Sequence, residues 1–395
     1  MVHGSADEGT RMRGGTDGER MWWQRAVARG FDPLPPPAAP VTLVRSGEVR
    51  GDPADQETGL PSGGLGVLLP TYVARCGPTA HETALRHLLD ALADVRAARP
   101  GLPLTLWLGM QYGPGERAEA LDRLRGLTRA ASSVPVVGFA LPGRGKLRTV
   151  NTALRLSRPL GHVGWLWTDD DVEFAPGCLA RLVDRFHERG RTGAVGAHLV
   201  ALPRPSAASR MMARVSGVTV PPGACPAAAC MLVAADVIAD GIPARRLADD
   251  GHVLFELLDP HAADPLHDLE VLPDAQGSFY RVGRAHDTLN RLRRSLYSHV
   301  TCTADYPWPT ARTYLSGTLF HGLWPLAAWD GSGGPVRGLK RWTVKAVHLT
   351  WFCAVAAGLA ARGAAGRPLR HVSWGDDGDF RSPAAEGRPT ARTGR

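Results

Sequence analysis

Short apolar runs alternate with stretches of helical periodicity through the first half of the chain. Residues 66–70 form the first apolar run, and residues 85–95 then repeat leucine and valine at intervals of three and four. An apolar run between turn residues is typical of a buried strand, and the second spacing is typical of a helix with one buried face. Repetition of this pair predicts four strands, at 66–70, 102–108, 134–141 and 163–168, and helices over 79–99, 116–129, 146–156 and 179–187.

The order of these elements predicts an α/β fold. Strand–helix alternation of this length indicates a Rossmann-like, mainly parallel mixed sheet with helices on both faces, and such sheets bind ligands at the carboxyl ends of their strands. The first helix follows a capping-box sequence, Thr-Ala-His-Glu, at residues 79–82. After residue 190 the alternation weakens, although residues 194–202 and 229–234 resemble strands and residues 287–300 resemble a helix.

The two ends of the chain have a different composition. Residues 1–62 are rich in Gly, Arg, Asp and Pro, which predicts a mostly irregular extension with one short helix near residues 21–29. The same composition over residues 366–395 predicts a disordered tail. The longest apolar stretch, 342–361, contains Lys345 and His348, so it predicts a buried or surface-lying helix rather than a membrane span.

Charge and cysteine spacing narrow the range of possible functions. The net charge is +8, but arginine supplies nearly all of the positive charge, and no basic run interleaved with aromatic residues argues for nucleic-acid binding. None of the six cysteines forms a C-x-x-C pair, so neither a zinc knuckle nor a redox dithiol is indicated. The first residues lack the apolar core of a secretory signal. Together these features predict a cytoplasmic protein with reduced thiols, for which membrane association is not favoured.

The clearest chemical signal is the acidic run Asp169-Asp170-Asp171, which directly follows the fourth predicted strand. Adjacent carboxylates repel one another, and a fold tolerates them best when a cation is bound beside them. Carboxylate oxygens suit Mg²⁺ or Mn²⁺, often bridged to a diphosphate. The alternative is an exposed acidic turn, because aspartate is a common turn residue. The position after a buried strand favours the metal site.

Two further segments carry candidate chemistry. Residues 142–151 place a glycine loop and the cations Lys146 and Arg148 at the start of a helix, where an anion is favoured, although a plain helix start would have the same appearance. The spacing does not match a Walker A loop. Asp249 and Asp250 precede an apolar helical stretch, where a carboxylate can be a helix cap or a general base.

In order, these segments resemble glycosyltransferase family 2, whose members have the GT-A fold for nucleotide-sugar transfer. The likeness covers about residues 66–300. The first strand ends in Pro-Thr-Tyr, like the family's nucleoside-binding turn, and residues 145–154 resemble its Gly-Lys…Leu-Asn segment. The acidic run matches its Asp-x-Asp (DxD) motif, and Asp250 falls at its catalytic base, with Asp249 in place of a glutamate.

The resemblance implies a domain order and a set of site residues. It divides the chain into the N-terminal extension (1–62), a GT-A glycosyltransferase domain (63–300) with a nucleotide-sugar half (63–190) and an acceptor half (191–300), a helical extension (301–365) and the tail (366–395). It implies donor contacts from Pro70, Thr71, Tyr72, Lys146, Arg148, Asn151 and Asp169, a Mn²⁺ or Mg²⁺ ion on Asp169 and Asp171, and Asp250 as the catalytic base.

Three positions depart from the family pattern. Val73 replaces a usual asparagine. The second strand should end in an aspartate that contacts the nucleotide base, but here it runs Leu108-Gly109-Met110-Gln111. These changes leave the donor nucleotide open. Residues 290–294 lack the Gln and Trp of the Gln-x-x-Arg-Trp motif of processive members, so we expect single transfers to a small acceptor.

The implied activity is metal-dependent, inverting transfer of a sugar from a nucleoside diphosphate to a hydroxyl or amine. A haloacid-dehalogenase-like phosphatase also has Asp-x-Asp after a strand, but no lysine lies between residues 172 and 249 to hold its phosphate. A nucleotidyltransferase would need a glycine- and lysine-rich loop that the chain lacks after its first strand. The alternative from another class is a repurposed, non-catalytic binding protein with the GT-A fold.

Overall fold

The computed structural model describes most of the chain. The described residues are 19–33, 40–45, 48–50, 59–73, 77–143, 145–202, 226–243, 245–280, 285–319 and 334–370. Most of the predicted tail and the first eighteen residues of the N-terminal extension lie outside these ranges.

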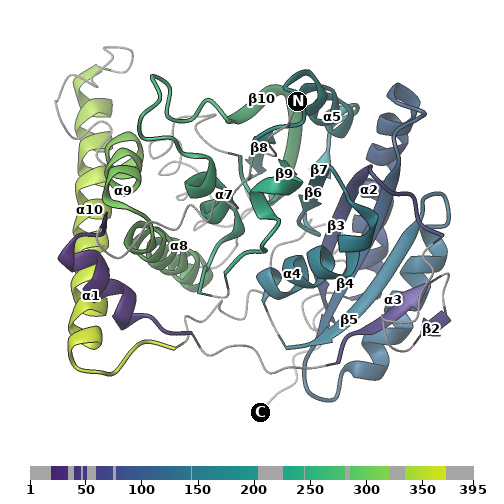
Figure 1. Cartoon of the computed structure of the whole chain (residues 1–395), viewed down its shortest axis with the longest axis horizontal. Helices are drawn as coiled ribbons and strands as arrows, with labels where there is room; N and C mark the ends of the chain where they lie inside the picture. The colour runs from purple at the N-terminus through teal and green to yellow at the C-terminus, as the bar shows by residue number, and fades with distance from the viewer. Residues whose placement is uncertain are drawn as a thin grey trace, which may run out of the picture.

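A ten-stranded sheet forms the centre of the fold (Figure 1). Its strand order is β2-β1-β5-β4-β3-β6-β9-β8-β10-β7, and the four neighbours β5, β4, β3 and β6 are all parallel. The sheet is therefore mixed around a parallel centre, and the predicted α/β fold class is confirmed. The strands are β1 (Thr42–Arg45), β2 (Glu48–Arg50), β3 (Leu65–Tyr72), β4 (Leu104–Tyr112), β5 (Val136–Pro142), β6 (Gly164–Thr168), β7 (Glu173–Phe174), β8 (Ala194–Leu202), β9 (Cys230–Ala234) and β10 (Leu269–Tyr280).

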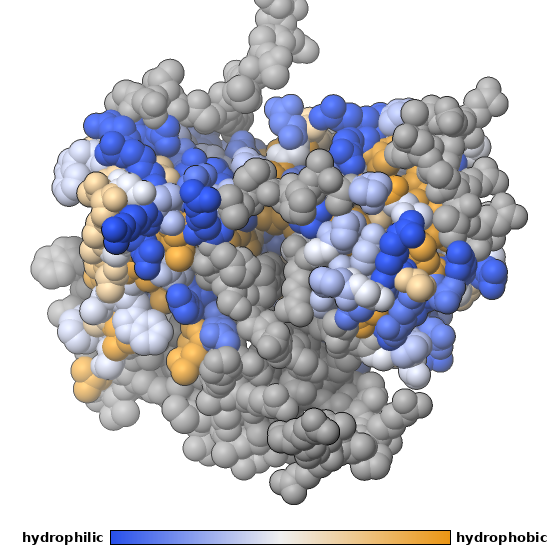
Figure 2. Space-filling view, turned by 90° about the horizontal axis from the view of Figure 1, so that it is seen from below, coloured by the Kyte–Doolittle hydropathy of each residue, from blue (hydrophilic) through white to orange (hydrophobic). Residues whose placement is uncertain are grey.

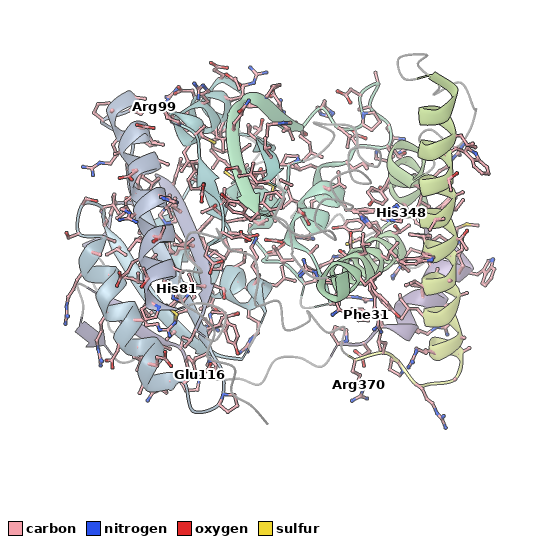
Figure 3. The ribbon with its side chains drawn as sticks, turned by 180° about the vertical axis from the view of Figure 1, so that it is seen from behind. Phe31, His81, Arg99, Glu116, His348 and Arg370 are labelled. Carbon is pink, nitrogen blue, oxygen red and sulfur yellow. The ribbon has the colours of Figure 1, made fainter. Side chains whose placement is uncertain are left out.

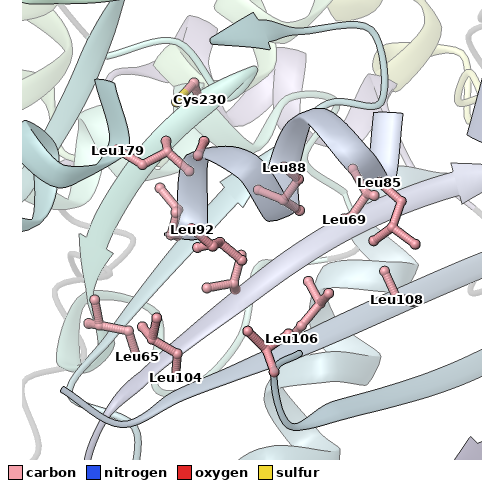
Figure 4. Close-up of a cluster of buried hydrophobic side chains, with 14 of the residues drawn as sticks. Leu65, Leu69, Leu85, Leu88, Leu92, Leu104, Leu106, Leu108, Leu179 and Cys230 are labelled. Carbon is pink, nitrogen blue, oxygen red and sulfur yellow. The ribbon is translucent and has the colours of Figure 1, made fainter. Parts of the chain in front are cut away.

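Helices cover both faces of this sheet because alternate strand residues point to opposite sides. On one face, Leu69 and Leu106 pack with leucines of α2 (Pro78–Ala98), as Figure 4 shows, and α3 (Arg117–Ala130) and α5 (Cys178–Glu188) complete that layer. On the other face, Trp107 and Trp167 pack with α4 (Lys146–Ser157) and α7 (Asp249–Leu257). Full burial of one such leucine stabilises the fold by about 1.5–3 kcal/mol, so the two apolar layers fix which helices lie over which strands.

The predicted helices of the first half are present, but one predicted start is wrong. The helix α2 begins at Pro78, after Gly77, and no side chain caps it. Thr79 therefore lies inside the first turn, where its carbonyl accepts a hydrogen bond from the Thr83 hydroxyl. Proline is well suited to the first helical position because its fixed φ is helical and its missing N–H has no partner there. The capping box at residues 79–82 is consequently not formed.

Two parts of the sheet differ from the sequence prediction. The strands β1 and β2 come from the extension expected to be mostly irregular, and β1 pairs antiparallel with β5. The strand β10 pairs in parallel with β8, with a change of register between Leu272 and Gln276. The predicted short helix at residues 21–29 is present as α1 (Trp22–Gly30).

A helical layer stands beside the sheet, at the left of Figure 1. It contains α1, α8 (Ala285–Asp305), α9 (Trp308–Tyr314) and α10 (Gly334–Ala364), and its apolar core includes Phe31, Phe255 and Leu359. His348 of α10 faces this layer (Figure 3), with its ring centroid 6.2 Å from that of His299. The apolar stretch at residues 342–361 is thus helical, and residues Ala346–Ala364 are long and apolar enough to cross a membrane by length and composition.

Candidate functional site

The carboxyl ends of β3 and β6 lie side by side at one edge of the sheet. These strands are parallel neighbours in the register Leu68 to Trp167, which brings the Pro-Thr-Tyr segment and Asp169 to the same edge. Within that segment Thr71 is buried, and its hydroxyl donates to the carbonyl of Gly109 on β4, 3.2 Å away. The edge is where ligands bind in open α/β sheets.

Lys146 joins the two acidic segments of the sequence. Its ammonium nitrogen lies 2.7 Å from Asp169 Oδ1 and 3.0 Å from Asp249 Oδ2, and it donates to the carbonyl of Ala228 at 2.9 Å. Asp169 follows β6 and Asp249 begins α7, so Lys146 connects the end of a strand with the start of a helix. The sequence prediction placed Lys146 against a phosphate, and in this structure its ammonium group is held by the two carboxylates.

Burial strengthens the ion pairs that Lys146 forms with Asp169 and Asp249. The side chains of Lys146 and Asp249 are 14% and 8% exposed, and that of Asp169 is 37% exposed. Burial lowers the pKa of the Lys146 ammonium, but Asp169 and then Asp249 outweigh it, so the pKa is raised overall. Burial raises the pKa of the Asp249 carboxyl, with Asp250 and Asp169 adding to the effect and Lys146 opposing it. Lys146 therefore stays charged, and it stabilises the ionised form of the carboxylates around it.

The loop before Lys146 is held by Gln111. The Gln111 amide donates to the carbonyl of Gly145 at 2.6 Å and accepts from the N–H of Gly145 at 3.1 Å. Gly145 has φ +130°, a conformation that side chains rarely adopt, which explains glycine immediately before the helix. Arg148, one turn later, donates to the carbonyl of Pro142 at 2.5 Å. Gln111 therefore positions the loop at Gly145, a role that the comparison with the family's aspartate at this strand end did not indicate.

Asn151 has a similar contact on the other side of α4. Its amide donates to the carbonyl of Ile242 at 2.7 Å and accepts from the N–H of Ile242 at 2.8 Å. Both hydrogen-bonding ends of its amide thus serve the segment that leads into α7. A donor contact by Asn151 stays a prediction, and the structure shows that this side chain positions the chain before Asp249.

Asp250 lies in the first turn of α7 and is partly exposed. Its Oδ1 accepts from the N–H of Gly251 at 2.8 Å, which satisfies one free amide at the helix start. Asp249 and Asp250 are neighbours with different surroundings, since the first is buried against Lys146 and the second is more open. The more open carboxylate is the one suited to meet a substrate.

A buried polar cluster also fixes the position of α7. Arg246 pairs with Asp305 at 2.5 Å and lies over the Tyr306 ring at 4.7 Å. The Tyr306 hydroxyl donates to Glu256 at 2.5 Å, and burial raises its pKa. Burial also lowers the pKa of His252 to about 3, so that ring is neutral. This cluster ties α7 to α8 and was not predicted from the sequence, because its members are spread over residues 246–306.

Asp169 and Asp171 offer the oxygen donors that Mg²⁺ and Mn²⁺ prefer. Within the part of the chain that the structure describes, no three His, Cys, Asp or Glu side chains gather as a metal site. These ions commonly bind through one or two carboxylates and complete their shell with water and substrate phosphates. A metal ion on Asp169 and Asp171 stays a prediction; in this structure Asp169 Oδ1 is engaged by Lys146, and further ligands would have to come from water or substrate.

Comparisons with solved structures give remote matches. No protein-family model matches the sequence, and no match was found among curated proteins. The mannosyltransferase PcManGT from Pyrobaculum calidifontis, solved with GDP-Man and Mn²⁺, has 18% identity, covering 87% of this chain and 93% of its own, with a TM-score of 0.43. TarS 1–349 from S. aureus, solved with UDP-GlcNAc, has 11% identity, 77% and 88% coverage and a TM-score of 0.33. A mycobacterial protein has 14% identity, 61% and 73% coverage and a TM-score of 0.35. At these TM-scores the description of the fold rests on the sheet order of this chain alone.

Proposed function

We propose that this chain is a metal-dependent, inverting glycosyltransferase of the family-2 kind. It would move a sugar from a nucleoside diphosphate to a hydroxyl or amine of a small acceptor, one transfer at a time. The observation that carries the proposal is the junction at Lys146, which brings Asp169 of the DxD motif and the start of α7 with Asp250 to one place. A turn of three aspartates with no function would not need this buried connection.

The donor would lie along the edge formed by the carboxyl ends of β3 and β6. Pro70, Thr71 and Tyr72 would contact the nucleoside, since they end β3 beside β6. When bound between Asp169 and Asp171, Mn²⁺ or Mg²⁺ would neutralise negative charge that develops on the leaving diphosphate. Arg148 adds positive charge near the same helix start, where backbone N–H groups favour an anion.

The acceptor would be activated by Asp250. Its carboxylate would take the proton of the attacking hydroxyl or amine, a step that contributes on the order of 10²–10⁴ in rate. Asp249 cannot do this in the present arrangement, because it is buried and paired with Lys146. Lys146 would hold Asp249 and Asp169 in place and keep the repulsion among the carboxylates low.

The decisive test is nucleoside diphosphate release with Mn²⁺ or Mg²⁺ over a panel of UDP-, GDP- and dTDP-sugars. We expect one donor class to turn over and to raise the unfolding temperature with metal, and Asp171→Asn to abolish both effects. Asp122→Asn makes the same chemical change on the exposed surface of α3 and should retain them. A folded protein that responds to no donor and no metal would contradict the proposal and favour a repurposed binding protein.

A further inference from the structure

The ammonium group of Lys146 already has its acceptors from the protein itself. Three oxygen atoms lie within 3.0 Å of its nitrogen: Asp169 Oδ1 at 2.7 Å, Asp249 Oδ2 at 3.0 Å and the carbonyl of Ala228 at 2.9 Å. An ammonium group has three N–H donors, so these oxygens equal its capacity. A phosphate contact, as the sequence predicts for Lys146, would therefore require the ammonium group to give up one of them.

The oxygens around Lys146 belong to fixed parts of the fold. The N–H of Asp169 donates to the carbonyl of Ala229 at 3.0 Å, and the Thr168 hydroxyl donates to the same carbonyl at 3.0 Å. Asp249 begins α7, which packs on the sheet. Lys146 instead reaches these oxygens through a flexible four-carbon stem. The ammonium group is therefore the part of this arrangement that can move.

The two carboxylates that hold Lys146 differ in their access to solvent. Asp169 is partly exposed, whereas Asp249 is buried. An ion that arrives from solvent can therefore reach Asp169, and there it meets a carboxylate that already carries an ammonium group. Like charges on one partly buried carboxylate repel one another strongly, because water screens them less than at the surface. Lys146 and a divalent cation are thus competitors for Asp169.

A diphosphate would change this balance. Its negative charge attracts both cations, and the start of α4 is a place where an anion is favoured. A buried carboxylate that loses its cation costs far more than an exposed one, so Lys146 would keep Asp249 and release Asp169. The released ammonium donor could then meet a phosphate oxygen. Binding of the cation and binding of the diphosphate are consequently linked, and the linkage is reciprocal.

We propose that Lys146 is an internal counter-ion on Asp169, which a divalent cation replaces only when a diphosphate binds with it. The inference rests on the proposed function, because the diphosphate and the divalent cation are taken from there. It adds an order to the binding events. The site stays closed to the metal alone, and release of the diphosphate returns Lys146 to Asp169 and favours release of the cation.

The test is binding of Mn²⁺ to the full chain, measured by the loss of the free-ion signal in electron paramagnetic resonance, with and without UDP, GDP or dTDP. Protein-free titrations correct for Mn²⁺ held by the nucleotide. We expect one nucleotide to strengthen Mn²⁺ binding roughly tenfold or more. In Lys146→Met, Mn²⁺ alone should bind roughly tenfold or more tightly than in the parent, and the gain from the nucleotide should shrink. Structural damage would weaken binding, so it cannot produce this result.

Two variants separate the occupancy of Asp169 from net charge. Lys146→Met/Asp249→Asn keeps the net charge of the parent, and it avoids the uncompensated buried carboxylate if Lys146→Met does not fold. It should still bind Mn²⁺ alone roughly threefold or more tightly than the parent. Arg155→Met lowers the net charge as Lys146→Met does, but at an exposed position roughly 13 Å further along α4, and should change binding by less than about twofold.

Hydrophilic residues are spread over both the left and the right side of the described surface in Figure 2, so some Mn²⁺ will bind to the surface of every variant. Only differences from Arg155→Met therefore count. Equal Mn²⁺ binding by the parent with and without every nucleotide, or folded Lys146 variants that gain no affinity, overturn the proposal.

Turnover of nucleotide sugars judges the proposed function separately. A parent that turns over a donor, with no gain of Mn²⁺ affinity in the Lys146 variants, refutes the counter-ion role alone. The expected binding results without turnover of any donor would support the counter-ion role and contradict glycosyl transfer.

Discussion

Removal of the Lys146 ammonium group is expected to destabilise the protein strongly. In Lys146→Met the apolar stem is largely kept, but Asp249 and Asp169 lose the cation at 3.0 and 2.7 Å. Removal of one partner from a buried ion pair costs about 3–5 kcal/mol, because the other charge is left uncompensated. Asp249 is buried and bears most of this cost, while the partly exposed Asp169 is screened by water. We therefore expect a loss of about 3 kcal/mol in the free energy of unfolding.

A double-mutant cycle in urea measures this effect. Lys146→Met, Asp249→Asn and the combined variant are compared at neutral pH, and we expect the combined loss to be smaller than the sum by about 1–3 kcal/mol. The cost of Lys146→Met should shrink as the pH falls toward 5. Without Lys146, burial and the negative charges of Asp250 and Asp169 act unopposed on Asp249, so its folded-state pKa rises further and the carboxyl takes up a proton that removes the buried charge.

Arg155→Met removes a cation from the exposed side of the same helix and should cost less than about 0.5 kcal/mol. A similarly small loss in Lys146→Met, or strict additivity with Asp249→Asn, would refute the reasoning. Either result would mean that the carboxylates are solvated well enough to do without the lysine.

Three further predictions concern catalysis, acid stability and helix packing. Asp250→Asn should lower kcat by about 10²–10⁴ while a bound donor still raises the unfolding temperature; an unchanged kcat would remove Asp250 from the mechanism. Burial lowers the pKa of His81, His162 and His252 to about 4, 4 and 3. The unfolded chain therefore binds more protons below about pH 6.5, and stability should fall between pH 7 and pH 5 by about 1–2 kcal/mol per histidine; a urea midpoint that holds or rises would contradict this. Gly109→Val should lower stability by about 2 kcal/mol or more, since even a Cβ there would lie 2.1 Å from a side chain of α4, and an unchanged urea midpoint would show that α4 can move away.

The central strands could be predicted because the apolar residues that are buried in them are consecutive in the sequence. The strands β3 and β6 are continuous apolar runs, as expected for strands covered on both faces. The strand β10 was missed because Pro273 and Gly277 interrupt its pattern, and it is extended through its pairing with β8. Likewise, β1 is four residues long and is defined by its place beside β5. Local patterns do not contain such long-range pairing.

The sequence predicted which residues belong to the candidate site, but not which of them contact one another. The sequence pointed to Asp169, Lys146 and Asp250 separately, from a strand end, a helix start and a second acidic pair. The contact of Lys146 with Asp249 depends on how α4 and α7 pack on the same face of the sheet, which no local spacing reveals. Gln111 illustrates the same limit, because its partner Gly145 is a neighbour only after β4 and β5 have paired.

The two side-chain amides beside α4 have a consequence for how the candidate site responds to charge. Each side-chain amide forms hydrogen bonds with both the N–H and the carbonyl of one backbone residue, as a paired strand does. Gln111 binds Gly145 in this way, and Asn151 binds Ile242. Neither amide titrates, and neither is weakened much by salt. If a diphosphate and a divalent cation bind as proposed, the ion pairs of Lys146 can rearrange while the backbone at Gly145 and Ile242 keeps its position. The backbone around the site would thus be uncoupled from the electrostatics of its ligands.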